Sequence, residues 1–250
     1  MKFPIALQPF TIREEMSQDY VGSLEKVAAI GYTGIELGLP PEGMTVAEQK
    51  ELLTRLGLQV IGTHCSLEQL TNDLDSITDY LHEVGGKYVA LSHHFDSREA
   101  VLEAAQAFNR IGENCAKQGV TFLYHNHNWE FTQFDGEYAL DILLRETDPS
   151  FVKMELDTYW VKRAGLDPAA YLRKLQDRCP LLHIKDMEPG EEQFFAEVGE
   201  GILNFADIFQ AAEKVGTEWL VVEQDQSRRS PLESIAISYN NLKKMGAIKE

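Results

Sequence analysis

Short apolar runs alternate with longer segments of helical period along the whole chain. Runs rich in aliphatic and β-branched residues have the length of buried strands, and they cover residues 3–8, 33–38, 58–64, 87–93, 120–127, 151–159, 180–186 and 219–225. Amphipathic segments typical of helices lie between them, for example 19–31, 97–119 and 205–216. Glycine closes several of these segments, as expected at helix C-termini, at Gly31, Gly57, Gly85, Gly119 and Gly216. The pattern predicts eight consecutive strand–helix units.

Eight such units in 250 residues have about thirty residues each, the size of a βα repeat. Strands that alternate with helices imply a parallel sheet with the helices packed outside it. Eight units favour closure into a (β/α)8 TIM barrel over an open sheet. No GxGxxG motif follows the first strand, which disfavours a dinucleotide-binding sheet. The sequence therefore predicts an α/β fold with a single TIM-barrel domain over residues 1–250.

Polar residues lie toward the C-terminal ends of the predicted strands, where barrel enzymes carry their chemistry. Side chains alternate across a strand, so the apolar positions that face the helices leave the other parity facing the barrel interior. This inner set contains Gln8, Glu36, His64, His125, His127, Lys153, Glu155, Asp157, His183, Lys185, Glu223 and Asp225. The opposite parity would bury Asp157, His183 and Glu223 against the helices, which costs far more free energy. We therefore expect these three side chains to meet at one mouth.

A carboxylate, an imidazole and a second carboxylate from three neighbouring strands form a set of metal donors. Mixed nitrogen and oxygen ligands of this kind suit Mn²⁺, Co²⁺, Zn²⁺ or Mg²⁺. A fourth ligand is expected from the fifth strand and the residues after it, which read YHNHNWEF at 124–131. The alternative is that these residues are buried polar groups that only form hydrogen bonds within the core. This explanation suits any one of the three residues more readily than all three together. The sequence predicts one divalent metal ion at Asp157, His183 and Glu223.

Charge and composition restrict the partners. The 23 basic and 40 acidic side chains give a net charge of -17, and this field repels nucleic acid and anionic membranes. The three cysteines show no CxxC spacing, as expected of reduced thiols. No signal-peptide pattern is present, and no apolar run approaches the roughly 20 residues of a membrane span. We expect a soluble cytoplasmic protein that binds neither nucleic acid nor membrane.

Several motifs, taken in chain order, resemble those of the xylose-isomerase-like TIM-barrel superfamily, in the branch described as sugar phosphate isomerases/epimerases. They are LQPFTIRE at the first strand, YHNHNWEF at the fifth, ELDTYWVKRAGLDP at the sixth, HIKDM at the seventh, VGEGILNF before the seventh helix and VVEQD at the eighth. The resemblance extends over essentially the whole chain. It implies a TIM barrel with one divalent metal ion held by Glu, Asp, His and Glu from strands five to eight.

Strand five departs from this family pattern. The resemblance maps the last three ligands onto Asp157, His183 and Glu223, but His125 occupies the position of the family's strand-end glutamate. Either His125 ligates the metal itself, or Glu130 folds back to it. We favour Glu130, because a carboxylate there preserves the charge of the site and provides an acid–base group.

The resemblance implies a metal-dependent sugar isomerase or epimerase that removes a proton from the carbon next to a carbonyl and passes through an enediolate. We assign Glu223 as one acid–base group and Glu130 or His127 as the other. The alternative is a keto-sugar or keto-inositol dehydratase, lyase or glycoside-cleaving enzyme on the same metal site. A non-catalytic sugar-binding barrel and an apurinic endonuclease are less favoured. Assembly into a homo-oligomer is left open.

Contacts with a small sugar or sugar-derived substrate are expected from His64, His93, His125, Trp160 and Lys185. The two strand-end histidines, His64 and His93, would donate hydrogen bonds to sugar hydroxyls, or else be rim histidines with partners inside the protein. Trp160 would form an apolar wall for the sugar ring. Lys185 would bind an oxyanion or phosphate, or else form an ion pair with Asp157 or Glu155.

Overall fold

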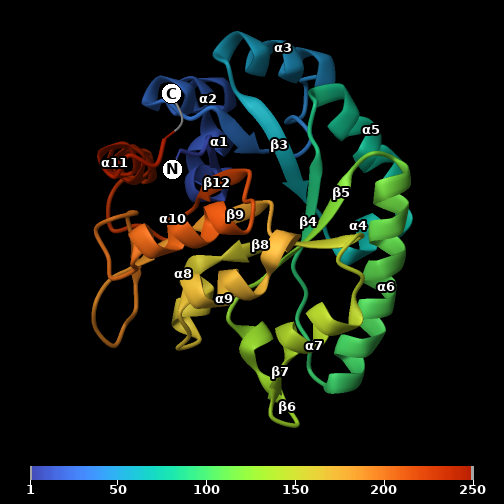
Figure 1. The fold of residues 1–250 in the computed structure, drawn as a ribbon. Helices are drawn as coiled ribbons and strands as arrows, with labels where there is room; N and C mark the ends of the chain where they lie inside the picture. The colour runs from blue at the N-terminus through green and yellow to red at the C-terminus, as the bar shows by residue number, and fades with distance from the viewer. Residues whose placement is uncertain (1, 249–250) are drawn as a thin grey trace.

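The computed structural model describes residues 2–248, and it contains a closed barrel of parallel strands (Figure 1). In barrel order the strands are β1 (Ile5–Leu7), β12 (Trp219–Val222), β9 (Leu181–Ile184), β8 (Val152–Asp157), β5 (Thr121–His125), β4 (Tyr88–Leu91), β3 (Gln59–His64) and β2 (Gly34–Glu36). Strand β1 pairs with both β12 and β2, which closes the barrel. The predicted (β/α)8 architecture is confirmed.

Helices surround the barrel (Figure 1). They are α1 (Arg13–Gln18), α2 (Tyr20–Ile30), α3 (Val46–Leu56), α4 (Leu67–Asn72), α5 (Leu74–Val84), α6 (Arg98–Lys117), α7 (Ala139–Glu146), α8 (Thr158–Arg163), α9 (Pro168–Lys174), α10 (Phe205–Lys214) and α11 (Pro231–Lys244). Gly57 and Gly85 follow α3 and α5 with φ angles of 69° and 79°. A left-handed residue of this kind ends a helix at low steric cost when it is glycine, as the sequence predicted.

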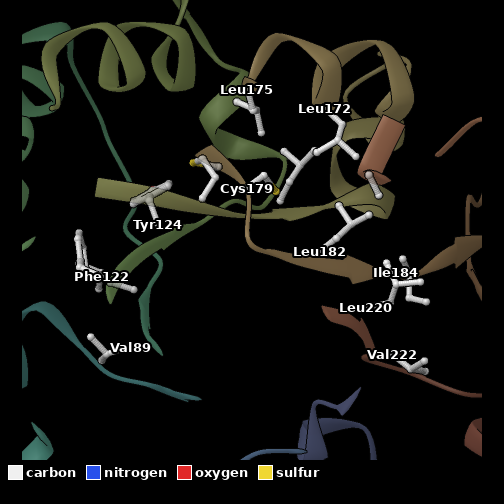
Figure 2. Packing of buried hydrophobic residues seen from close by; sticks show 14 of the residues in the cluster. Val89, Phe122, Tyr124, Leu172, Leu175, Cys179, Leu182, Ile184, Leu220 and Val222 are labelled. Atoms are coloured by element: carbon white, nitrogen blue, oxygen red, sulfur yellow. The ribbon is translucent and has the colours of Figure 1, made fainter. Parts of the chain in front are cut away.

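The barrel strands bury both of their faces. Side chains that face the helices form the larger apolar cluster, and Figure 2 shows part of it, with Leu182 of β9 and Leu220 of β12 among the labelled residues. The inner face carries a smaller apolar cluster of Ala6, Ile61, Tyr88, Ala90, Leu123, Leu181 and Val221. Leu181 lies two residues before His183, and Val221 two residues before Glu223. Apolar residues therefore fill the barrel below the polar groups at the C-terminal strand ends.

The strands are shorter than the predicted runs, and β8 shows the physical reason. The predicted run 151–159 ends at Asp157, because α8 begins at the next residue. Oδ1 of Asp157 accepts hydrogen bonds from the backbone N–H groups of Tyr159 at 2.9 Å and Trp160 at 3.1 Å. These bonds satisfy amide groups that have no partner within the first helical turn. The strand therefore turns into a helix at a residue predicted to ligate metal.

Two short antiparallel pairs lie in the loops that follow β5 and β9. In the first, β6 (Gln133–Phe134) pairs with β7 (Glu137–Tyr138), and in the second, β10 (Asp186–Met187) pairs with β11 (Phe195–Ala196). Both loops belong to the barrel face that carries the strand C-termini, the usual place of an active site in this fold. Across residues 2–248, none of the helices combines the length and apolar character needed to cross a membrane.

Candidate metal centre at the barrel mouth

Four buried side chains from four neighbouring strands bring metal-ligating atoms together. His125 ends β5, Asp157 ends β8, His183 lies in β9 and Glu223 follows β12 by one residue. One donor atom of each residue lies within 4.8 Å of those of the other three. The structure thus brings Asp157, His183 and Glu223 together as expected, and the fourth donor comes from His125.

Asp157 uses its two carboxylate oxygens differently. Oδ1 caps α8, whereas Oδ2 accepts no hydrogen bond from residues 2–248 although it is buried. Oδ2 lies 3.1 Å from Nζ of Lys185, which is an ion-pair distance without hydrogen-bond geometry. A buried oxygen with free lone pairs is costly unless a cation meets it. Together with two imidazoles and a second carboxylate, this oxygen forms a donor set that fits a divalent metal ion.

A second carboxylate–imidazole group lies beside the first and shares two of its residues. Its centre is Glu155, whose Oε2 lies 2.8 Å from Nε2 of His64, 2.9 Å from Nδ1 of His125 and 3.3 Å from Nε2 of His183. These four residues form another set of donor atoms within 4.8 Å of one another. Alternation along β8 placed Glu155 on the inner face, but sequence reasoning assigned it no role in the site. The sequence signal that could have identified Glu155 was the alternation of inward and outward side chains along β8.

Opposite charges hold the groups around Glu155 in their ionised forms. Burial lowers the pKa of His64, but the carboxylates of Glu155 and Glu36 outweigh burial and raise it to about 10. Burial raises the pKa of Glu155, but His183 and His64 lower it well below its usual range. Buried charges persist when such partners offset the loss of hydration. The imidazole of His64 therefore holds a proton beside the metal centre.

Glu36 and Glu223 hold the ring of His183 from both sides. The two ring nitrogens of His183 lie 2.8 Å from Oε2 of Glu36 and 2.9 Å from Oε2 of Glu223. The side-chain amide of Gln8 donates a hydrogen bond to the same oxygen of Glu36 at 2.9 Å. Partners of this kind orient a histidine ligand and set which ring nitrogen carries a proton. Glu36 is thus a second residue that sequence reasoning placed inward without a role.

Lys185 forms ion pairs with three carboxylates. Its Nζ lies 2.6 Å from Glu223, 2.8 Å from Asp225 and 3.1 Å from Asp157. Burial lowers the pKa of Lys185, but these carboxylates outweigh it and raise the pKa well above the usual value. The ion pair with Asp157 is one of the two alternatives that the sequence left open. The ammonium contacts two of the four candidate ligands, Asp157 and Glu223. It would therefore neutralise part of their negative charge alongside a bound metal ion.

Glu130 lies outside both donor groups, although the sequence favoured it over His125 as the strand-five ligand. Its Oε2 accepts the backbone N–H of His127 at 2.8 Å, and its Oε1 lies 2.8 Å from the hydroxyl of Tyr124. Burial raises the pKa of Glu130 to about 7. The carboxyl group is directed into the protein, where it braces the loop after β5, so His125 is the better placed candidate for the strand-five donor.

An aromatic surface borders the metal centre on the side of β5 and β8. The ring of His127 stacks on Trp129 with centres 4.1 Å apart, and the ring of Trp160 lies 5.4 Å from His127. Burial lowers the pKa of His127 to about 2, so its ring is uncharged, and its Nδ1 is 2.9 Å from Oγ of Ser92. Trp160 therefore lies where the expected apolar wall would be, and its contact with substrate stays a prediction.

His93 lies apart from this surface. Its ring packs edge-on against Phe95 and Phe108, at 5.4 Å and 6.3 Å between ring centres. Its backbone carbonyl accepts a hydrogen bond from Tyr124 at 2.8 Å. Phe95, Phe108 and Tyr124 belong to the cluster that faces the helices. The aromatic packing of the His93 ring favours the alternative of a rim histidine, and its contact with substrate stays a prediction.

Comparison with known proteins agrees with the fold and with the resemblance. The inosose dehydratase of Geobacillus thermodenitrificans is 26% identical over an alignment 244 residues long, and the match covers 81% of this chain and 81% of that protein. The inosose dehydratase of Lacticaseibacillus casei is 24% identical over an alignment 256 residues long, and the match covers 84% of each chain.

A solved structure of a sugar phosphate isomerase/epimerase from Parabacteroides distasonis superposes with a TM-score of 0.85. It is 25% identical to this chain, and the match covers 98% of this chain and 95% of that one. The family model described as the xylose isomerase-like TIM barrel matches residues 24–245. The chain belongs to the xylose isomerase-like TIM-barrel family.

Proposed function

We propose that the protein is a divalent-metal-dependent enzyme that isomerises a sugar by moving a proton on the carbon next to a carbonyl group. The observation that carries this proposal is the convergence of donor atoms from His125, Asp157, His183 and Glu223 at the barrel mouth. The isomerase/epimerase structure that superposes over 98% of this chain supports the reaction class. The sugar itself is not specified by these residues.

The four convergent residues would hold the metal ion. A bound divalent ion supplies Lewis-acid polarisation of the substrate carbonyl. The chain contributes two carboxylates and two imidazoles, and Oδ2 of Asp157 is a buried donor that accepts no hydrogen bond from residues 2–248. Glu36 and Glu155 would not bind the metal ion directly. Each contacts the imidazole of His183, which is one of the candidate ligands. They orient the ring rather than touch the substrate.

Glu223 is the proposed proton acceptor, and Lys185 the group that meets the developing negative charge. Burial raises the pKa of Glu223, but the ammonium of Lys185 and the ring of His183 lower it well below its usual range. Glu223 is therefore ionised and able to receive a proton. The Nζ of Lys185, 2.6 Å from Oε2 of Glu223, is placed to donate a hydrogen bond to a substrate oxygen that becomes an oxyanion.

The site favours chemistry with one shuttling base over epimerisation with two opposed bases. The carboxyl of Glu130 braces its loop and lies outside the donor groups. The uncharged ring of His127 is bound to Ser92. A single base suffices for aldose–ketose exchange, whereas proton transfer on both faces of a carbon needs two. We therefore place isomerisation before epimerisation.

Elimination of water from a keto-sugar or keto-inositol is the second candidate. The two curated relatives described above, both inosose dehydratases, favour it. Elimination begins with the same proton removal and then requires an acid to protonate the departing hydroxyl group. His64 is the candidate acid, since it holds a proton and 31% of its side chain is exposed at the mouth.

Proton NMR in D₂O tests both candidates on the Mn²⁺-loaded protein with a panel of ketoses and inosose. Deuterium incorporation without loss of water supports isomerisation, and a product that has lost water supports elimination. Glu223→Gln should abolish either reaction, whereas Glu113→Gln, on the exposed face of α6, should leave it unchanged. Metal analysis of each variant separates loss of the base from loss of the ion. Metal-loaded protein that exchanges no proton with any member of the panel would overturn the proposal.

A further inference from the structure

A cavity opens beside the metal centre, on the side of β3, and we call it the β3 pocket. Its volume is about 390 Å³, and its lining is mostly apolar. The side chains that shape it include Leu39, His64, Cys65, Ile77 and Tyr80. Cavities that bind small molecules begin at about 300 Å³. The β3 pocket is thus large enough for a ring-sized group.

His64 is the wall that the β3 pocket shares with the metal centre. Its Nε2 lies 2.8 Å from Oε2 of Glu155, and its ring centre is 5.2 Å from that of His125. One imidazole therefore separates the pocket from a candidate metal ligand. The pocket and the candidate metal centre therefore meet at His64.

The lining is suited to an apolar group. Leu39 is 73% exposed, and covering such a side chain is favourable. The hydroxyl of Tyr80 donates its hydrogen bond to the carbonyl of Gly38 at 2.6 Å, so it is not free to bind a ligand. Burial raises the pKa of Cys65 to about 11, so its thiol is uncharged. A ligand in the pocket would therefore contact these side chains in uncharged form.

The lining is poorly suited to a phosphate group. Its ten described residues contain no lysine or arginine, and Asp73 adds a carboxylate. The charge of His64 is already balanced by Glu155 and Glu36. A phosphorylated end of a sugar would therefore lose its hydration without gaining a cationic partner.

We propose that the β3 pocket binds an apolar ring or alkyl group carried by the substrate, so that the substrate is a sugar derivative that keeps a free carbonyl group and has an apolar substituent on another carbon. This inference rests on the proposed function, because the reacting sugar is taken to lie over His125, Asp157, His183 and Glu223. The apolar group lies against Leu39 and Ile77, and its burial positions the sugar for proton transfer.

Ligand-observed NMR on the Mn²⁺-loaded protein tests the inference with phenyl β-D-glucoside, methyl β-D-glucoside and 4-nitrophenol as probes. The phenyl glucoside should bind about 10-fold more tightly than the methyl glucoside, with saturation transfer strongest at the phenyl protons. Leu39→Asp should remove that difference and weaken 4-nitrophenol binding, and the milder Ile77→Ala should do so in part. Val21→Ser, at an exposed apolar position on α2 outside the pocket, is the control and should change neither.

Two results overturn the inference. The first is a phenyl probe that binds no more tightly than the methyl glucoside, together with no binding of 4-nitrophenol. The second is a change of molar mass in light scattering for Leu39→Asp with unchanged probe affinities, which would make the pocket a contact between two copies of the chain. Phenyl binding that depends on Leu39, combined with no proton exchange on any substrate, would retain the pocket and remove the proposed function. Proton exchange on simple sugars, without tighter binding of the phenyl glucoside, would retain the proposed function and remove the proposed role of the pocket.

Discussion

The carboxyl group of Glu130 shows how burial sets the protonation of a single residue. The hydroxyl of Tyr124 has one proton, and it lies 2.8 Å from both the carbonyl of His93 and Oε1 of Glu130. The carbonyl can only accept, so when Tyr124 donates to it, Glu130 completes its own hydrogen bond by holding a proton. Burial raises the pKa of Glu130 to about 7, which agrees with a neutral carboxyl group up to neutral pH.

Glu130→Gln should remove a pH dependence of stability. The folded pKa of about 7 lies above the ordinary value of 4.5, so the folded state binds this proton more tightly than the unfolded state. Its contribution is complete below the ordinary value and is lost as the pH rises through about 7. Between about pH 5 and pH 8 the wild-type free energy of unfolding should fall by about 2 kcal/mol from this group.

The glutamine variant imitates the protonated carboxyl group, because its amide can donate to Tyr124 while its oxygen accepts from His127. Urea unfolding at both pH values should therefore show a flatter profile for Glu130→Gln than for the wild type. The exposed substitution Glu113→Gln should keep the wild-type slope. Equal slopes for Glu130→Gln and wild type would show that Glu130 is ionised in the folded protein throughout.

At the scale of elements, the loop from β10 to α10 is organised around one buried carboxylate. Asp186 accepts four backbone hydrogen bonds, from Met187 at 2.8 Å, Gly199 at 2.9 Å, Gly201 at 2.9 Å and Leu203 at 3.1 Å. A Cβ atom on Gly201 would lie 2.3 Å from Oδ1 of Asp186, so only glycine allows this approach. The VGEG motif thus folds around the aspartate of HIKDM.

This loop also supports the metal centre from outside. Phe195 of β11 stacks on Tyr159 with ring centres 4.2 Å apart, and the backbone N–H of Tyr159 donates to the capping oxygen of Asp157. The hydroxyl of Tyr159 donates to the carbonyl of Gln193 at 2.7 Å. The position of a candidate ligand therefore depends on packing between the start of α8 and the loop.

Asp186→Ala should lower the free energy of unfolding by about 3 kcal/mol, because it leaves buried amide groups without an acceptor. It should also make the chain between residues 188 and 203 more susceptible to proteolysis. Urea unfolding and limited digestion measure the two effects. Glu191→Ala removes an exposed carboxylate from the same loop and should change neither. Similar results for the two variants would contradict the organising role of Asp186.

At the scale of the whole molecule, closure of the barrel is what creates the metal centre. The four candidate ligands come from strands β5, β8, β9 and the end of β12, and the β1–β12 pairing completes the ring that holds them. An unfolded chain does not keep these side chains within reach of one ion. A metal ion therefore binds the folded state in preference and stabilises it by mass action.

Mn²⁺ at about one hundred times its dissociation constant should raise the free energy of unfolding by about 2.7 kcal/mol, and chelation should reverse the gain. His125→Ala should weaken metal binding by at least about 10-fold, whereas Glu130→Gln should bind like the wild type. Thermal unfolding with and without Mn²⁺, with metal content by mass spectrometry, measures both. Metal retained by His125→Ala and lost by Glu130→Gln would return the fourth ligand to Glu130.

The signals that predicted the fold act over short stretches of chain. Strand and helix periods, with glycine at positions such as Gly57 and Gly85, identified eight units and their order. Alternation along the strands also placed Asp157, His183 and Glu223 on the inner face. Strand ends were less accurate, because the capping bonds of Asp157 that end β8 form only when α8 folds against it.

The sequence by itself determined the barrel, its inner polar face and the three candidate donors Asp157, His183 and Glu223, because the period of a strand dictates where each side chain points. Only the tertiary structure shows that His125 lies among the candidate donors and Glu130 does not, because the path of the loop after β5 depends on Tyr124, a residue that packs against the helices. It also decided that Glu155 and Glu36 lie among the imidazoles, and that the β3 pocket opens beside His64. These features depend on distances between strands that are far apart in the sequence, and the alternation of residues within one strand does not determine such distances.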